Sequence, residues 1–478
     1  SDTITVNVTV NPRNDAPVHT VPAAQAVDQD TDLVFSSGAG TLVAVADVDV
    51  DETAIPNNTV RITFAAEHGT LSLQRTTGLT FSSGDGTADA SMVFTGNLAN
   101  VNAAMDGMRY RGDAGYSGAD TLSIITSDQG HTGAGGVMTD TDAVAITVRD
   151  TAGPTVTNVT SSNANGSYRA GQAIMIQVSF SEAVDVTATP RLLLETGTND
   201  WYAEYWSGSG TNALTFMYLV LSPHESPDLD YRATDSLILN GGTIKDAAGN
   251  DAILTLPTPG AAGSLGANKD IVIDTTAPIA PNTPDLQAAS DSGSSSTDNV
   301  TEAATPVFDI TGVESLSTVT LTFTPVGGGS SVIGTASVGE GQAYCAIAPG
   351  TALAPGTYTV TAVQTDRAGN ASVASPALAP ALLIAVAPSV STQAASGVAS
   401  TTATGNGTIV ALGSPSPTAH GFVWNTTGDP TLTDSSTNEG SADATGAFTS
   451  AISGLSPNTP YYVRAYATNA LTTVYGDQ

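Results

Sequence analysis

Short runs in which apolar residues alternate with Thr, Ser or Gln recur along the whole chain. Clear examples are residues 174–180 (IMIQVSF), 319–323 (VTLTF) and 358–363 (YTVTAV). Because successive side chains of a strand point to opposite faces, this period of two indicates strands with one buried face. Helical periodicity is nearly absent, and only residues 98–108 are expected to form a short helix or turn. The sequence therefore predicts an all-β fold made of tandem β-sandwiches arranged end to end.

Four breaks divide the chain, and at each of them a strand-like run is followed by a proline. They end at Pro17, Pro154, Pro278 and Pro388, about 110–137 residues apart, an interval that suits one sandwich of about 100 residues. Proline fixes φ and stiffens the chain, so we expect short linkers that hold successive units in line. The predicted units are residues 1–14, 15–149, 150–275, 276–385 and 386–478. The first unit is expected to be the last strand of a preceding repeat or a donor strand.

The charge balance excludes several functions. The chain carries 45 Asp and Glu against 13 Lys and Arg, a formal net charge of −32, and only 12% of its residues are charged. A surface with so few cations lacks the electrostatic footprint of a nucleic-acid-binding protein. A hydrophobic content of 40% is too high for a disordered acidic tail. No run of about 18 apolar residues is present, so membrane insertion is not expected.

Cysteine usage and composition point to the bacterial exterior. Cys345 is the single cysteine, and it cannot form the internal disulfides that usually stabilise secreted eukaryotic domains. Polarity comes mainly from Thr, Ser, Asn and Gly, which suits β-rich extracellular modules. Ser1 is followed at once by a strand-like pattern and not by a signal peptide. We therefore expect a secreted, bacterial cell-surface location and a fragment or matured form of a longer protein.

Motifs in the first two units resemble known bacterial repeats. Residues 15–149 resemble a bacterial cadherin-like repeat, on the entry motif NDAP at 14–17, the GTLSL run at 69–73 and the closing DTD at 140–142. Residues 150–275 resemble an immunoglobulin-like repeat of large bacterial surface proteins, on VSFSE at 178–182 and KDAAGN at 245–250.

The last two units carry further resemblances. Residues 276–385 resemble a second bacterial Ig-like type that closes with TDRAGN at 365–370. Residues 386–478 resemble a fibronectin type III module, on GLSPNTPYYVRA at 454–465, a pattern in which a tyrosine hydroxyl pins the corner before strand F. Together these resemblances imply a tandem-repeat segment of a large bacterial surface protein of the adhesin type.

Acidic residues occur where an Ig-like topology brings loops together. The start of the first strand, the B–C loop and the F–G loop lie at one end of a seven-strand sandwich, so acids distant in sequence are expected to meet at each junction. The segment 47–52 (DVDVDE) also places three aspartates on one side of an extended chain. Adjacent carboxylates repel one another unless a cation lies between them.

Related cadherin and bacterial Ig-like arrays bind calcium at their junctions, so the resemblance implies Ca²⁺ as a structural cofactor here. The predicted ligands are Asp15, Asp47, Asp49, Asp51, Glu52, Asp128, Asp142, Asp150, Glu182, Asp246, Asn250, Asp274, Asp366 and Asn370. Oxygen ligands favour Ca²⁺ over zinc or copper. The alternative interpretation is that these residues only solubilise the surface and initiate turns. The junction near Pro388 is expected to bind no metal, because the last unit lacks a D-x-A-G-N loop.

The resulting functional prediction is a non-catalytic extracellular stalk or spacer, stiffened by calcium. Its expected partners are neighbouring repeats of the same polypeptide or identical subunits, with any host or surface glycan or protein contacted by regions outside this segment. Enzymatic activity is not expected, because the five histidines show no metal or catalytic spacing, and the chain has no G-x-S-x-G elbow and no phosphate loop.

Two alternatives stay open. One is a subunit of an extracellular filament that assembles by β-strand donation through the N-terminal segment. The other is a carbohydrate- or receptor-binding module that uses the aromatic run 201–206 (WYAEYW). Tyr202 and Trp206 are expected on one face of that strand and Trp201 and Tyr205 on the other, with at least one face in the core.

Overall fold

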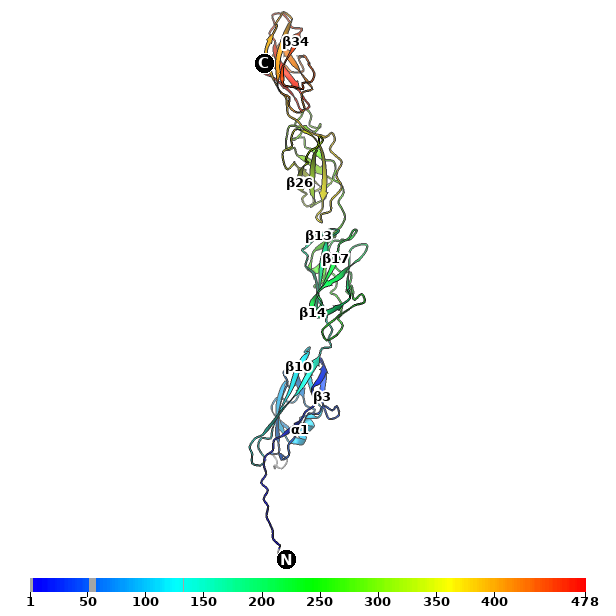
Figure 1. The fold of residues 1–478 in the computed structure, drawn as a ribbon, viewed down its shortest axis with the longest axis vertical. Helices are drawn as coiled ribbons and strands as arrows, with labels where there is room; N and C mark the ends of the chain where they lie inside the picture. Colours follow the sequence, from blue (N-terminus) through cyan, green and yellow to red (C-terminus); the bar gives the residue numbers. More distant parts are fainter. Residues whose placement is uncertain (1–2, 51–56, 132) are drawn as a thin grey trace.

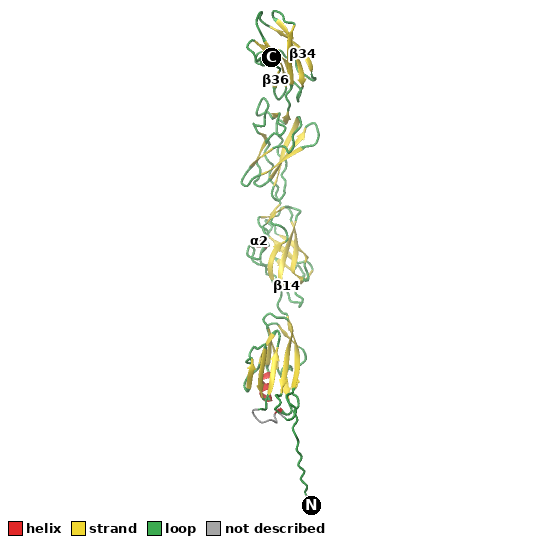
Figure 2. Cartoon of the chain, turned by 90° about the vertical axis from the view of Figure 1, so that its left-hand side faces the viewer, coloured by secondary structure: helices red, strands yellow, loops and turns green. Residues whose placement is uncertain are grey.

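The chain forms a row of four β-sandwiches, as the alternating runs predict. The structure is a computed structural model that describes all residues except 1–2, 51–56 and 132. Figure 1 shows the sandwiches following one another along the long axis, from blue and cyan through green and yellow to red. The view turned by 90° in Figure 2 shows the same arrangement, with strands in all four sandwiches and very little helix. The predicted all-β, end-to-end fold is confirmed.

The N-terminal segment leaves the first sandwich as an extended tail (Figure 1). Residues 3–12 belong to no strand, and the side chains of Ile4, Val6, Val8 and Val10 are 75–84% exposed. The tail joins the sandwich at Arg13, which forms a parallel bridge with Ala134. Both N-terminal interpretations, a strand of a preceding repeat and a donor strand, need a partner strand for this segment.

The first sandwich packs a six-stranded sheet, in the order β2-β11-β10-β5-β8-β7, against the smaller sheets β3-β9-β6 and β1-β4. Its strands are β1 (Val18–Thr20), β2 (Gln25–Asp28), β3 (Asp32–Phe35), β4 (Ala44–Ala46), β5 (Val60–Ala65), β6 (Gly69–Ser72), β7 (Leu79–Ser83), β8 (Ser91–Gly96), β9 (Met108–Gly112), β10 (Gly118–Ser127) and β11 (Thr139–Arg149). The expected short helix is α1 (Leu98–Met105), capped by the Asn97 side chain. Alternate residues of β5 and β8 enter one apolar core that contains Phe64 and Phe94.

The second sandwich has a long sheet in the order β12-β14-β17-β16-β15-β19, with β20 also paired to β14, and a short sheet β13-β21-β18. Its elements are β12 (Val156–Ser161), β13 (Gly166–Tyr168), β14 (Ala173–Thr187), β15 (Arg191–Leu194), β16 (Trp201–Ser207), β17 (Thr211–Leu219), β18 (Glu225–Ser226), β19 (Leu237–Ile238), β20 (Thr243–Lys245), α2 (Leu265–Asn268) and β21 (Ile271–Asp274). Neither α1 nor α2, the helices of the described residues, is long and apolar enough to cross a membrane.

The third sandwich pairs the sheets β22-β24-β27 and β23-β29-β28-β25-β26. Its strands are β22 (Asp285–Leu286), β23 (Val300–Thr301), β24 (Phe308–Thr311), β25 (Thr318–Pro325), β26 (Val332–Ser337), β27 (Tyr344–Ile347), β28 (Gly356–Thr365) and β29 (Leu382–Ile384). Phe308 and Phe323 meet in the centre of its core with their ring centroids 5.5 Å apart. Cys345 is buried in the same core, and burial raises the pKa of its thiol.

The fourth sandwich pairs the sheets β30-β31-β34 and β33-β32-β35-β36. Its strands are β30 (Ser389–Ser396), β31 (Thr402–Ala411), β32 (Ala419–Asn425), β33 (Ser435–Ser436), β34 (Gly446–Ser453), β35 (Tyr462–Thr468) and β36 (Thr473–Tyr475). The expected tyrosine corner is present, because the backbone N–H of Ser456 donates to the Tyr461 hydroxyl at 3.1 Å.

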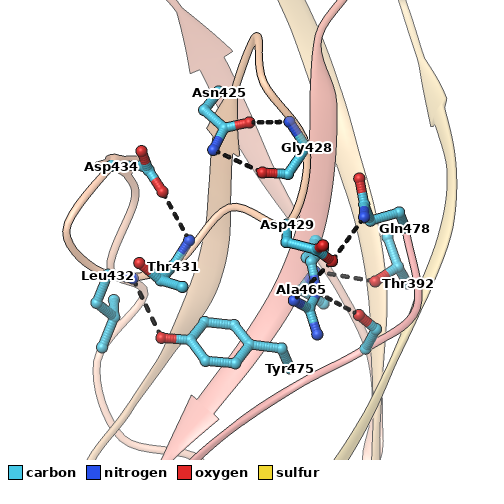
Figure 3. A network of polar contacts seen from close by, with 12 residues as sticks. Thr392, Asn425, Gly428, Asp429, Thr431, Leu432, Asp434, Ala465, Tyr475 and Gln478 are labelled. Carbon is cyan, nitrogen blue, oxygen red and sulfur yellow. Dashed lines mark hydrogen bonds and ion pairs between the residues drawn. The ribbon is translucent and has the colours of Figure 1, made fainter.

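Polar contacts hold the last strand in place, as Figure 3 shows. The Tyr475 hydroxyl accepts a hydrogen bond from the backbone N–H of Leu432 at 3.1 Å, and the Gln478 amide donates to Asp429 at 2.9 Å. Since these partners lie on the loop that joins β32 to β33, the C-terminal segment is tied to the body of the fourth sandwich.

Candidate metal sites at the junctions

The entry to the second sandwich gathers three carboxylates. Asp150 follows β11, Glu182 lies within β14, and Asp246 follows β20. Strands β14 and β20 pair through Asp185 and Lys245, and this pairing brings the two acids of the sandwich together. One oxygen from each of the three carboxylates lies within 4.8 Å of the others. These three acids, distant in sequence, therefore lie together at one end of the second sandwich.

Burial and charge act together on this cluster. Burial, and then the negative charges of Asp150 and Asp246, raise the pKa of Glu182. A raised carboxyl pKa means that the folded state disfavours the charged form. A divalent cation between the three groups would remove that penalty, because it supplies positive charge where hard oxygen atoms already converge.

The loop from Asp246 to Asn250 also holds the linker. The Asn250 side-chain amide donates to the Asp246 carboxylate at 2.7 Å and to the backbone carbonyl of Asp150 at 3.3 Å. Its backbone N–H donates to the same carboxylate at 2.8 Å. Burial alone would raise the pKa of Asp246, but these hydrogen bonds outweigh it and the pKa is lowered. The Asn250 amide nitrogen is thus occupied by protein contacts, a role that the sequence did not indicate.

The junction between the second and third sandwiches repeats this arrangement. The Asn370 amide donates to the Asp366 carboxylate at 2.9 Å and to the backbone carbonyl of Asp274 at 3.0 Å. The pKa of Asp274 is raised, first by burial and then by the charges of Asp366 and Glu225. Glu225 belongs to the second sandwich and Asp366 to the third, so carboxylates from both sandwiches approach the linker.

Direct hydrogen bonds also cross this second junction. Glu225 accepts from the backbone N–H of Thr275 at 3.0 Å and from the Thr276 hydroxyl at 2.8 Å. Arg169, in the second sandwich, donates to the backbone carbonyl of Gly369 in the D-x-A-G-N loop of the third at 2.7 Å. The linker is therefore held from both sides even before any cation is considered.

At the entry to the first sandwich, Asp15, Asp47 and Asp49 lie together. The backbone N–H of Asp15 donates to Asp49 at 2.9 Å, and Asp47 accepts from the backbone N–H groups of Asp49 and Val50 at 3.2 Å each. Burial, followed by the side-chain contact with Asp49, raises the pKa of Asp47 to about 6. Asp51 and Glu52, two further predicted ligands, lie outside the described residues.

Asp128 lies beside the same entry. Its carboxylate accepts from the Asn14 side chain and from the backbone N–H groups of Gly130 and Met138 at 2.8 and 2.9 Å. Three buried oxygens of this region, Oδ1 of Asn14, Oδ2 of Asp47 and Oδ1 of Asp49, have no hydrogen-bond partner among the described residues. Buried polar atoms normally have partners, so these three oxygens are unusual, but among the described residues the acids of this entry do not bring three ligand atoms within 4.8 Å of one another. Asp142 lies elsewhere, beside His19 and Asp140.

One buried acidic residue was not among the residues singled out from the sequence. Asp291, in the polar loop before β23, is 6% exposed, and its Oδ1 has no partner among the described residues. Burial raises its pKa, and the neighbouring charge of Asp298 adds to the effect. The loop 290–299 (SDSGSSSTDN) has the composition of an ordinary turn segment, and only the spacing of its two aspartates could have drawn attention to it.

The aromatic run on β16 is divided between surface and core. Trp206 and Trp201 are 62% and 46% exposed, and the Trp201 ring packs against His224. Tyr205 packs edge-on against Phe216 of the core. Tyr205 therefore takes part in core packing, whereas Trp201 and Trp206 keep exposed surface.

Comparisons with known proteins agree with part of this description. Residues 276–379 match the bacterial Ig-like domain family, which confirms the Ig-like prediction for the third sandwich. No curated protein matches the chain.

The solved structures that match the chain include tandem arrays. One is a tetra-tandem repeat in the extending region of a large adhesion protein, with 18% identity over 96% of this chain and 98% of that chain and a TM-score of 0.25. A second comes from a study of host cell surface retention of a 1.5-MDa bacterial ice-binding adhesin, with 13% identity, coverages of 76% and 96% and a TM-score of 0.29. A third is the ICAM-5 D1–D4 ectodomain fragment, with 12% identity, coverages of 97% and a TM-score of 0.28.

Proposed function

We propose that this chain is a non-catalytic extracellular stalk segment of a bacterial cell-surface protein of the adhesin type, and that calcium stiffens its junctions. Two observations support the stalk: four sandwiches stand in a row, and the third matches a bacterial Ig-like family. The observation that carries the calcium proposal is the convergence of Asp150, Glu182 and Asp246 within 4.8 Å at the first linker.

Calcium would act by tying a linker residue to the body of a sandwich. Asp150 lies on the linker, whereas Glu182 and Asp246 belong to the second sandwich, so one ion held by all three would restrict the swing between the first two sandwiches. At the next linker, Glu225 and Asp366 come from different sandwiches and both raise the pKa of Asp274. An ion there would join the second and third sandwiches more directly.

Replacing Glu182 with Gln is expected to change stability in opposite directions with and without calcium. Without calcium the variant should be slightly more stable than the native chain at neutral pH. The pKa of Glu182 is raised in the folded state, so the fold loses stability as pH rises and this carboxyl becomes charged. A glutamine carries no charge and avoids that loss. Many extracellular modules bind calcium with a dissociation constant of ~10⁻⁴–10⁻³ M, so about 5 mM calcium should raise the free energy of unfolding of the native second sandwich by about 1–2 kcal/mol. The variant should not show this increase.

The measurement is the calorimetric unfolding of the second sandwich in calcium and in EDTA. Glu195→Gln, which neutralises an exposed acid of the same sandwich, is the matched control and should respond to calcium like the native chain. If the native midpoint is the same in calcium and EDTA, or if Glu182→Gln responds as the native chain does, the calcium site at this junction is wrong.

A second candidate function is a filament subunit that donates its N-terminal strand. It is favoured by one observation: the alternating side chains Ile4, Val6, Val8 and Val10 are exposed on an extended segment that has no partner strand among the described residues. Such a segment can complete a sheet of a neighbouring copy. Electron microscopy over a range of concentrations tests this function. Filaments that disappear on the double substitution Val6→Lys and Val8→Lys would support it, and discrete short rods at every concentration would reject it.

A further inference from the structure

His19 of the first sandwich faces two aspartates across a gap between strands. It lies on the short edge strand β1, and its side chain is only 1% exposed. Its Nδ1 is 3.3 Å from Oδ2 of Asp140 and 3.3 Å from Oδ2 of Asp142. Asp140 and Asp142 are two residues apart on β11, so both project from the same face of that strand. One nitrogen and two oxygens therefore converge within 4.8 Å of one another.

The imidazole is held in position from behind. Its Nε2 lies 2.6 Å from the hydroxyl of Thr126, which is fully buried on β10. Asp140 is fixed as well, because it accepts from the backbone N–H of His19 at 2.8 Å and from that of Thr141 at 2.9 Å. Metal-binding histidines characteristically donate their second ring N–H to such a partner, which orients the ring and leaves the other nitrogen as a ligand. With its proton on Nε2, His19 directs the Nδ1 lone pair at the two carboxylates.

The two nitrogen–oxygen spacings match those around a small tetrahedral ion. Ligands about 2.0–2.1 Å from a zinc ion are separated from one another by about 3.3–3.4 Å in tetrahedral geometry, and the two nitrogen–oxygen distances here are 3.3 Å. Calcium takes oxygen ligands, whereas imidazole nitrogen suits zinc and related transition metals. Two carboxylates and a neutral imidazole carry a charge of −2, which one divalent ion neutralises.

We propose that His19, Asp140 and Asp142 bind one divalent transition-metal ion of the zinc class, separate from the calcium sites at the junctions. The Asp140 and Asp142 side chains are 30% and 41% exposed, so the ion can enter from solvent and a water molecule can fill the fourth position. The ion would fasten edge strand β1, and the entry segment that precedes it, to β11. This site does not depend on the proposed stalk function.

The competing arrangement is a protonated His19 held between the two aspartates with no metal. Isothermal titration of zinc chloride into the EDTA-stripped and dialysed full chain separates the two, with 5 mM calcium present throughout to fill the calcium sites. The native chain should bind one zinc ion. His19→Asn and Asp142→Asn should each weaken that binding at least about tenfold, the lower end of the loss seen when even a supporting partner of a metal ligand is removed.

The exposed His68, which stacks on Tyr116 in the same sandwich, provides the matched control. His68→Asn should bind zinc as the native chain does. Circular dichroism checks that each variant is folded. If His19→Asn is misfolded, the Asp142→Asn variant, which changes a half-exposed side chain, decides whether zinc binds at these residues. Absence of zinc binding by the native chain, equal binding by native chain and Asp142→Asn, or an equal loss in His68→Asn would each overturn the proposal.

Discussion

Replacing Asp120 with Ala is expected to destabilise the first sandwich by about 3–4 kcal/mol. The substitution leaves several donors without an acceptor, and each unsatisfied buried donor costs ~1–3 kcal/mol. Asp120 is 5% exposed on β10, and its carboxylate accepts from the Tyr110 hydroxyl at 2.7 Å. It also accepts from the backbone N–H groups of Glu67 and His68 at 3.1 Å each and of Thr121 at 2.6 Å. One side chain thus joins β10, β9 and the turn between β5 and β6.

The effect of Asp120 should also depend on pH. Burial acts to raise its pKa, but the hydrogen bonds outweigh burial, so the pKa of Asp120 is lowered in the folded state. A carboxyl whose pKa is lowered on folding stabilises the folded state at any pH above its unfolded-state pKa. That stabilisation is lost as the pH falls through its folded-state pKa. The native first sandwich should therefore weaken more steeply below about pH 4 than an Asp120→Ala chain does.

Thermal unfolding of the full chain at pH 7 and at pH 3 measures both effects. Asp113→Ala, which removes an exposed acid of the same sandwich, should leave the midpoint nearly unchanged, and Asp120→Asn, which keeps one acceptor, should fall in between. A loss below about 1 kcal/mol for Asp120→Ala, the size typical of one ordinary hydrogen bond, would contradict this role.

Replacing Phe323 with Ala is expected to destabilise the third sandwich alone, by about 3–5 kcal/mol, the usual cost of removing a buried phenylalanine. Phe323 is fully buried and packs edge-on against Phe308. Each apolar core lies within one sandwich; that of the third contains buried residues from Leu286 to Ile384. The cavity left by the substitution therefore has no direct contact with the other cores.

Differential scanning calorimetry of the full chain tests this independence. One transition should move to lower temperature while the others stay within about 1 °C, and the exposed Val326→Ala variant of the same sandwich should move none. A single cooperative transition that shifts as a whole would show that the sandwiches unfold together and that the separate-core description is wrong.

The fold was accessible from the sequence because its signal is local. A strand with one buried face repeats every two residues, as β25 shows, where Val319, Leu321 and Phe323 are all fully buried. The convergence of Asp150, Glu182 and Asp246 could be expected for a different reason: Ig-like connectivity brings distant segments to the same end of a sandwich. The sequence placed Glu182 in a loop, however, and the structure places it within β14.

Other features depend on tertiary register, which the sequence does not display. The direction of the Asn250 and Asn370 amides, toward a linker carbonyl, is decided by where the loop meets the linker. Asp142 was assigned to a junction, yet the pairing of its neighbours places it beside a histidine more than 120 residues away. Asp291 could not be singled out from the sequence, because its burial is a property of the folded loop. Only that burial makes its unpaired oxygen unusual.

Part of the acidic excess of the chain is concentrated at the junctions between sandwiches. The net charge of −32 belongs to the whole chain, but part of the acidic excess stands at the linkers, where neighbouring carboxylates raise the pKa of Glu182 and of Asp274. Without cations the same residues should loosen the row of sandwiches, and with cations they should stiffen it.

Small-angle X-ray scattering of the full chain in calcium and in EDTA tests that claim most directly. We expect an extended rod on the order of 150 Å or longer in calcium, at ~30 Å of strand length per sandwich plus linkers, and a shorter, broader distance distribution in EDTA. The double variant Glu182→Gln and Asp366→Asn should resemble the EDTA form even in calcium, whereas Glu195→Gln should not. Superimposable scattering profiles of the native chain in calcium and in EDTA would contradict calcium stiffening of the junctions.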